Sequence, residues 1–320
     1  MATTMTKIKK ILLGLSLGES DINLVKFAEG LATGLGAKLV LSHAVRPFHY
    51  YAYAGEAPVF PLDSYGAIID ELDEGHATKK LEAIQAQLKD PSISEIKLCF
   101  DDPAEGLDEL AEEIHADLIL VGSEYTPDMW QGVSTSISLM KYSKKPVMVV
   151  PSQCESFLSK PLNVYCGDDL SDSCQTARQN ALMIAEQMNA KEFHHFHIKD
   201  MSEGDISRMI EHVRQAAALG KVSGDVALQV ETYREKVEEE TQKQLRDRLN
   251  PSHKNLHIKQ DVLFGKVSDS IHKLMAADKK AGKLLVFGKH HIFHSRSFSL
   301  GKIPYPTMLQ QGVCVLVVPT

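Results

Sequence analysis

The chain has 320 residues, of which 43% are hydrophobic and 24% are charged. This length suits two domains of about 150 residues better than one, and the composition is that of an ordinary globular protein. The formal net charge of −7 gives no basis for nucleic-acid binding, because that binding depends on clustered Lys and Arg.

The sequence also bears on the compartment. No apolar run reaches the ~20 residues of a membrane span, and no apolar region precedes the first expected strand as in a signal peptide. The five cysteines form no C-x-x-C pair, and Cys99, Cys166 and Cys314 lie inside apolar runs, where cysteine packs as a small hydrophobic residue. We therefore expect a cytoplasmic protein without a membrane span.

The first half of the chain alternates short apolar runs with amphipathic stretches. Asp21–Gly36 has apolar residues at helical spacing and ends on a glycine that suits a helix C-cap. Arg46–Tyr65 is rich in Pro, Tyr and Gly and is long enough to be a functional loop. In chain order we expect strand Lys10–Leu15, helix Asp21–Gly36, strand Lys38–Val45, helix Ala67–Leu88, strand Ile96–Phe100, helix Pro103–His115, strand Leu118–Gly122, a helix starting near Ser134–Ser138, and strand Val147–Val150.

The second half repeats this succession. Asp200–Gly224 stands where the first half has its aromatic loop, although its composition is unrelated. The expected elements are strand Leu162–Cys166, helix Ser171–Met188, strand Glu192–Lys199, helix Val226–Leu249, strand Leu256–Phe264, helix Val267–Ala277, strand Leu284–Gly288, a short helix Ile303–Gln311 and strand Val313–Val318.

The repeat predicts the fold class. In both halves the final strand begins 25 positions after a glycine that ends an earlier strand. These strands begin at Val147 and Val313, and the glycines are Gly122 and Gly288. A period near half the chain indicates two homologous domains, which we place at 1–153 and 160–320. Strands alternating with long helices predict an α/β fold with doubly wound parallel sheets.

Several segments resemble the universal stress proteins in their tandem, two-domain form. They are Lys10–Leu13, Gly36–Ala44, Asp102–Ala104, Asp117–Gly122 and Lys145–Val150, in this order. The resemblance implies a five-stranded, adenine nucleotide alpha hydrolase-like domain in each half. Family dimers pair through the final strand. We therefore expect Val147–Val150 and Val315–Val318, apolar edge strands in isolated domains, to pair within one chain as a pseudo-dimer.

Many family members bind ATP, through an Asp after the first strand and a signature after the fourth strand. The signature is Gly, two residues, Gly, nine residues, Gly, then Ser or Thr. In the first half Ser16 replaces the Asp, and Tyr125 and Thr135 replace two glycines. Ser136 keeps the hydroxyl position and suits a helix N-cap or an anion contact. We therefore expect the first domain to be structural, with a degenerate site.

The second half keeps more of this pattern. Asp168 falls at or one place past the Asp position, and Gly288 and Gly301 have the spacing of the first and last signature glycines. His291 stands at the intermediate glycine and Lys302 at the Ser/Thr position. Glycines and a helix N-terminus suit a phosphate. These five residues are our candidate ATP site.

Histidines offer a competing interpretation of the same pocket. His194, His195 and His197 lie on the second strand of this half, and His290, His291 and His294 lie in the segment after Gly288. Because the carboxyl ends of neighbouring parallel strands border one crevice, His197, His290, His291 and His294 are candidate zinc ligands beside Asp168.

We therefore expect a cytoplasmic universal stress protein that serves as a stress-response ligand-binding module or scaffold. We expect it to have no catalytic activity or only a weak one. The alternatives are an ATP-binding switch with at most slow hydrolysis and a zinc-binding stress protein. The residues leave open which small molecule or protein is the partner, and whether the chain forms a further homodimer.

Overall fold

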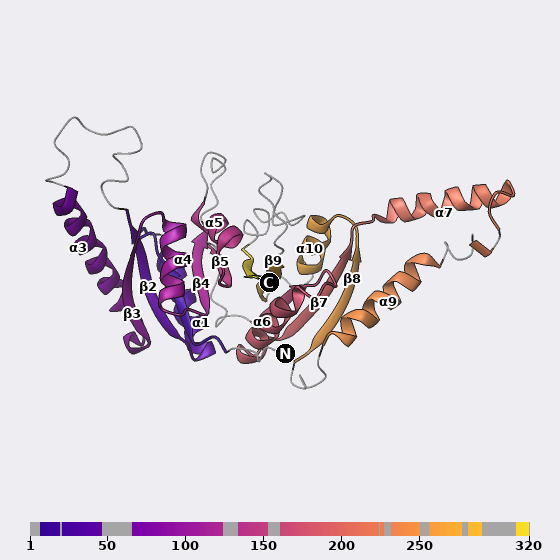
Figure 1. The fold of residues 1–320 in the computed structure, drawn as a ribbon. Coiled ribbons are helices and arrows are strands. Elements are labelled where there is room, and N and C mark those ends of the chain that lie inside the picture. The colour runs from indigo at the N-terminus through magenta and orange to yellow at the C-terminus, as the bar shows by residue number, and fades with distance from the viewer. Residues whose placement is uncertain are drawn as a thin grey trace, which may run out of the picture.

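The computed structural model describes residues 7–19, 21–46, 66–123, 134–152, 161–223, 225–226, 232–249, 256–276, 281–289 and 312–319. In this part of the chain, strands and helices alternate and build one wide sheet with helices on both faces (Figure 1). None of the helices described there is long and apolar enough to cross a lipid bilayer.

The first five strands form one end of the sheet, in the order β3-β2-β1-β4-β5, and all of them are parallel. The order reverses between β1 and β4, which is the switch point where doubly wound sheets open a crevice. The elements are β1 (Lys10–Gly14), α1 (Asp21–Leu35), β2 (Lys38–Val45), α3 (Gly66–Gln85), β3 (Ser94–Phe100), α4 (Pro103–Glu113), β4 (Leu118–Ser123), α5 (Thr135–Tyr142) and β5 (Val147–Pro151), with a short 3-10 helix at Pro91–Ile93.

The last five strands repeat that order as β8-β7-β6-β9-β10, again all parallel. Their elements are β6 (Leu162–Gly167), α6 (Cys174–Gln187), β7 (Glu192–Lys199), α7 (Glu203–Ala218), α9 (Tyr233–Asp247), β8 (Ile258–Phe264), α10 (Val267–Ala276), β9 (Gly282–Lys289) and β10 (Cys314–Pro319). The tandem α/β fold is thereby confirmed. The boundaries 1–153 and 160–320 stay a prediction.

The two halves join through their final strands. β5 pairs with β10 in antiparallel register, Val147 opposite Val317 and Val149 opposite Val315. Each half therefore covers the apolar edge that the other would expose, and all ten strands belong to one sheet. This pairing confirms the expected pseudo-dimer within one chain.

The core has two layers, one on each face of the sheet, and both layers run through the two halves. Side chains alternate along each strand, so Ile11 and Leu13 enter one layer and Leu12 enters the other. Helices α1 and α6 cover the first layer and touch each other across the junction. Helices α4, α5 and α10 cover the second.

Backbone details repeat at the carboxyl ends of β1 and β6. Leu17 and Leu170 both have positive φ angles, of 63° and 67°. Asp168 N donates to Phe196 O at 2.9 Å, as Leu15 N does to Ser42 O at 2.9 Å. The turns that lead into both crevices therefore have one conformation. By this register, Asp168 corresponds to Leu15 and Asp169 corresponds to Ser16.

The halves differ most at the far end of the sheet, where α7 and α9 extend away from the body (Figure 1). Sequence analysis treats Asp200–Gly224 as the counterpart of a loop, but α7 is a 16-residue helix that begins with a capping box between Ser202 and Asp205. Its apolar stripe was overlooked because charged residues dominate this segment. The expected helix Ile303–Gln311 lies outside the described residues.

Candidate functional site

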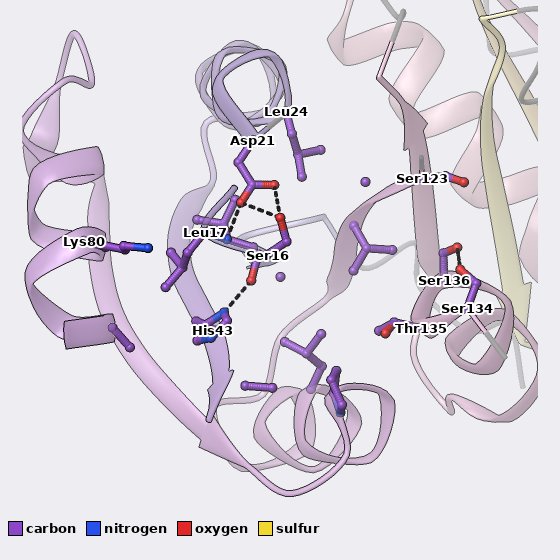
Figure 2. A pocket seen from close by; sticks show the side chains of 18 of the residues that line it. Ser16, Leu17, Asp21, Leu24, His43, Lys80, Ser123, Ser134, Thr135 and Ser136 are labelled. Atoms are coloured by element: carbon purple, nitrogen blue, oxygen red, sulfur yellow. Dashed lines mark hydrogen bonds between the residues drawn. The ribbon is translucent and has the colours of Figure 1, made fainter. Parts of the chain in front are cut away.

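A pocket of about 830 Å³ opens at the switch point of the first half, at the carboxyl ends of β1, β2 and β4 (Figure 2). Its apolar walls include Leu15, Leu24 and Leu107. Gly14 and Gly122 line the pocket where β1 and β4 end. The pocket thus combines apolar walls between strand ends and helices with polar side chains at its sides.

One wall is the turn from β1 into α1. Asp21, the first residue of α1, accepts hydrogen bonds from Leu17 N at 2.6 Å and from Ser16 Oγ at 3.2 Å. Burial raises the pKa of the Asp21 carboxyl, and these hydrogen bonds counteract only part of that effect. Asp21 therefore fixes the strained turn at Leu17 and also faces the pocket.

The opposite wall is the N-terminus of α5 (Figure 2). Ser134 occupies the N-cap position with an extended backbone, and its side chain makes no capping hydrogen bond. The Ser134 and Ser136 hydroxyls lie 2.8 Å apart, and Ser123 and Thr135 line the pocket beside them. Backbone N–H groups of the first helical turn and the positive end of the helix dipole suit an anion at this wall.

Basic side chains line the pocket away from the serines. Lys80 of α3 points toward the pocket from the side opposite α5 (Figure 2), and His76 of the same helix also lines it. Arg46, which follows β2, forms a half-exposed ion pair with Asp102 at 3.7 Å. An anionic group would thus lie between a helix N-terminus and at least one basic side chain.

The comparisons with known proteins agree with this fold. Residues 7–151 match the model of the universal stress protein family. These residues form a universal stress protein domain. A universal stress protein from Archaeoglobus fulgidus DSM 4304 is similar over 98% of this chain and 99% of its own, with 14% identity and a TM-score of 0.62. A candidate universal stress protein from Pseudomonas aeruginosa UCBPP-PA14 covers 98% of this chain and 94% of its own, with 12% identity and a TM-score of 0.53.

At such low identity these two structures show the fold alone, but they show it for both halves. No curated protein sequence matches the chain. The universal stress protein domain of the first half therefore contains the described pocket, whereas sequence analysis places the candidate site in the second half.

In the second half, Asp168 is held by its own chain. Its Oδ2 accepts from Arg178 at 2.6 Å and from His195 Nε2 at 2.9 Å, and its Oδ1 accepts from Leu170 N at 2.7 Å. Burial alone would raise the pKa of this carboxyl, but the hydrogen bond from His195 and the nearby positive charges lower it. Asp168 is therefore an ionised, buried partner of Arg178.

Of the other candidate ATP residues, Gly288 lies in β9 opposite Val318 of β10. His291, Gly301 and Lys302 fall outside the described residues, as do the candidate zinc ligands His290 and His294. The structure thus leaves this ligand set a prediction.

His197 is the one candidate zinc ligand that the structure describes. Its Nδ1 donates to Asp168 O at 2.7 Å, and burial lowers its pKa, so the ring is neutral. In the universal stress protein domain, His43 Nδ1 makes the same contact with Leu15 O at 2.8 Å. Since both halves repeat this bond, it belongs to the architecture of the turn.

The other two histidines of β7 have separate environments. His195 is fully buried beside Asp168, and its Nδ1 has no hydrogen-bond partner among the described residues. His194, on the other face of the sheet, stacks on Tyr165 and lies 3.0 Å from Asp261 and 3.1 Å from Glu192. His194 therefore shares no site with His197, whereas His195 and His197 contact different atoms of Asp168.

A different group of potential ligands lies near Asp168. Asp168, Asp169 and Cys174 bring one ligand atom each within 4.8 Å of the others. However, burial raises the pKa of the Cys174 thiol to about 12, and this thiol donates to Asp169 at 3.0 Å. In the described structure these side chains are thus paired within the chain, Cys174 with Asp169 and Asp168 with Arg178.

Sequence reasoning missed most of the described pocket. Asp21, His43, His76 and Lys80 all line it, but none of them belongs to the family signature. One usable signal was Asp21, an acidic first residue of a helix directly after a strand. The basic residues of α3 have no comparable signal, because only the tertiary structure brings that helix over the strand ends.

Proposed function

We propose that this chain is a ligand-binding universal stress protein whose first-half pocket takes a nucleotide or a similar molecule that combines a flat apolar group with a phosphate. The observation that carries the proposal is the pocket itself, where the α5 N-terminus and its serines face Lys80 across apolar walls. This site differs from the structural role that sequence analysis expects for the first domain.

The chemistry of the pocket favours binding over catalysis. Its polar groups are spread over separate walls, with Asp21 and Ser16 on one and Ser134 to Ser136 on another. A catalytic site needs such groups to converge on one reacting atom. We therefore propose a stress-response module that senses its ligand by binding it.

For the second half we propose a supporting role. Its Asp168 carboxylate is already neutralised within the chain, by Arg178. An ATP-binding switch in this half would have to displace that ion pair. Zinc binding through His290, His291 and His294 stays a prediction, since it concerns residues outside the described part.

We also propose a cytoplasmic location, supported by four free and buried cysteines among the described residues. Within the family, the tandem sequence pattern looks most like that of the bacterial universal stress protein E.

Binding of ADP to the full chain, measured by titration calorimetry, tests the proposed function. Ser134→Asp keeps a good helix N-cap but places a negative charge where the phosphate would lie. Ser134→Asn is the matched control, because it is neutral and caps equally well. We expect Ser134→Asp to weaken ADP binding at least ~10-fold and Ser134→Asn to change it little.

Two results would overturn the proposal. One is a wild-type chain that binds neither ADP nor ATP. The other is ADP binding that Ser134→Asp leaves at wild-type strength, since the phosphate would then lie elsewhere.

A further inference from the structure

A lysine of the second half reaches into the first. Lys289 is the last residue of β9, it is only 7% exposed, and its Nζ donates to Ser143 O at 3.0 Å. Ser143 is the C-cap residue of α5. A buried lysine is uncommon in proteins, so its position needs a specific partner.

The surroundings of Lys289 provide that partner. A cation at the C-terminal end of a helix satisfies the last carbonyl groups and interacts favourably with the helix dipole. Burial lowers the pKa of the Lys289 ammonium, and the Asp108 carboxylate of α4 counteracts this effect. Asp108 Oδ1 is itself buried and has no hydrogen-bond partner among the described residues. The ammonium therefore donates to a helix end of the first half, and the charge of Asp108, in the same half, acts on it.

The helix that Lys289 holds is the helix that lines the pocket. α5 has eight residues, so its two ends are only about 12 Å apart. Ser134, Thr135 and Ser136 at its N-terminus line the pocket, while Ser143 at its C-terminus accepts from Lys289. α5 also packs against α4 and β5. A shift of the C-terminal end would therefore move the serine wall.

We propose that Lys289 is a positioning residue for the first-half pocket: by holding the C-terminal end of α5, it lets the second half of the chain set the ligand affinity of the first. This inference rests on the proposed function where it concerns affinity. The placement of α5 itself does not depend on any ligand.

The test uses the full chain with Lys289→Met, which removes the charge and the hydrogen bond, and Lys289→Gln, which keeps a donor without the charge. Lys259→Met is the matched control, because Lys259 pairs with Glu192 at 2.9 Å in the second half, on β8. The measurements are the Kd for ADP and hydrogen exchange of the α5 amides.

We expect Lys289→Met to weaken ADP binding at least ~5-fold and to speed exchange in α5, with a smaller change for Lys289→Gln and none for Lys259→Met. Wild-type Kd and wild-type α5 exchange in Lys289→Met would overturn the inference. If that variant does not fold, the same two readouts in Lys289→Gln decide. If the wild-type chain binds no ADP, the proposed function fails, and unchanged α5 exchange would then overturn this inference separately.

Discussion

Arg178 Nη1 lies 2.6 Å from Asp168 Oδ2, in an ion pair that buries both side chains and fills the turn at the end of β6. The corresponding turn of the first half has Leu15 in place of Asp168 and lines the pocket. The two crevices thus share a backbone conformation and differ in charge. This difference explains why the residue that resembles a nucleotide ligand in sequence acts as an internal partner in the structure.

The first prediction concerns this ion pair. Arg178→Met removes the closer of the two guanidinium groups beside the buried Asp168 carboxylate and leaves only Arg248, at 4.0 Å, so we expect a loss of about 3–5 kcal/mol in the free energy of unfolding. Arg234→Met is the control, since Arg234 pairs with Glu203 on the surface and should contribute less than about 1 kcal/mol. Urea unfolding of both variants measures the difference. Equal losses of unfolding free energy in the two variants would show that the buried ion pair stabilises the chain no more than the surface pair does.

The second prediction concerns the pH dependence of Asp21. Because burial raises its pKa in the folded state, the folded chain binds a proton more tightly there than the unfolded chain does. Stability contributed by this group is therefore present at low pH and is lost as the pH rises through the range above the ordinary aspartate pKa of 3.8. The Asp21→Asn variant cannot ionise at this position and should not lose this stability. Its melting temperature should therefore decline less than that of the wild-type chain between acid and neutral pH. Parallel melting curves would contradict this.

The third prediction compares two helical glycines. A Cβ atom on Gly106 in α4 would lie 2.2 Å from Phe100 O, a backbone atom that cannot move aside, whereas a Cβ atom on Gly75 in α3 meets nothing within 4 Å. Gly106→Ala should therefore destabilise the chain by about 1–3 kcal/mol. Gly75→Ala should stabilise it by up to about 1 kcal/mol through helix propensity. Thermal unfolding of the pair checks both signs, and destabilisation by both variants would refute the packing argument.

The fourth prediction concerns the junction of the two halves. Deleting 313–320 removes β10 and exposes apolar edges on β5 and β9, which pair with it in the intact chain. We expect the truncated chain to aggregate, as measured by size-exclusion chromatography with light scattering. A soluble, monomeric and folded product would show that the antiparallel pairing of Val149 with Val315 is dispensable.

Much of the fold could be predicted from the sequence, because its signals are local and repeated. β2 and β7 have the bounds that were expected, and the pairing of the final strands was expected from two apolar edge runs together with the resemblance to family dimers. α7 was missed because Ile206 is its single fully buried residue. The apolar stripe of α7 therefore hardly enters the core, and its many charged residues hid the stripe from sequence analysis.

The amino-acid sequence by itself determined the repeat, the alternation of strands and helices, and the universal stress protein family of residues 7–151. Only the tertiary structure decided which polar groups are available to a ligand. Arg178 follows Asp168 by ten residues, yet its place one turn into α6 brings its guanidinium onto the carboxylate. Lys80 and Ser136 come from helices far apart in the chain and line opposite sides of one pocket, because α3 packs against β2 and β3 whereas α5 packs against β4 and β5. The sequence gives the identity and spacing of the charged residues. The net charge that a ligand meets in a pocket depends on distances between side chains, and only folding sets those distances.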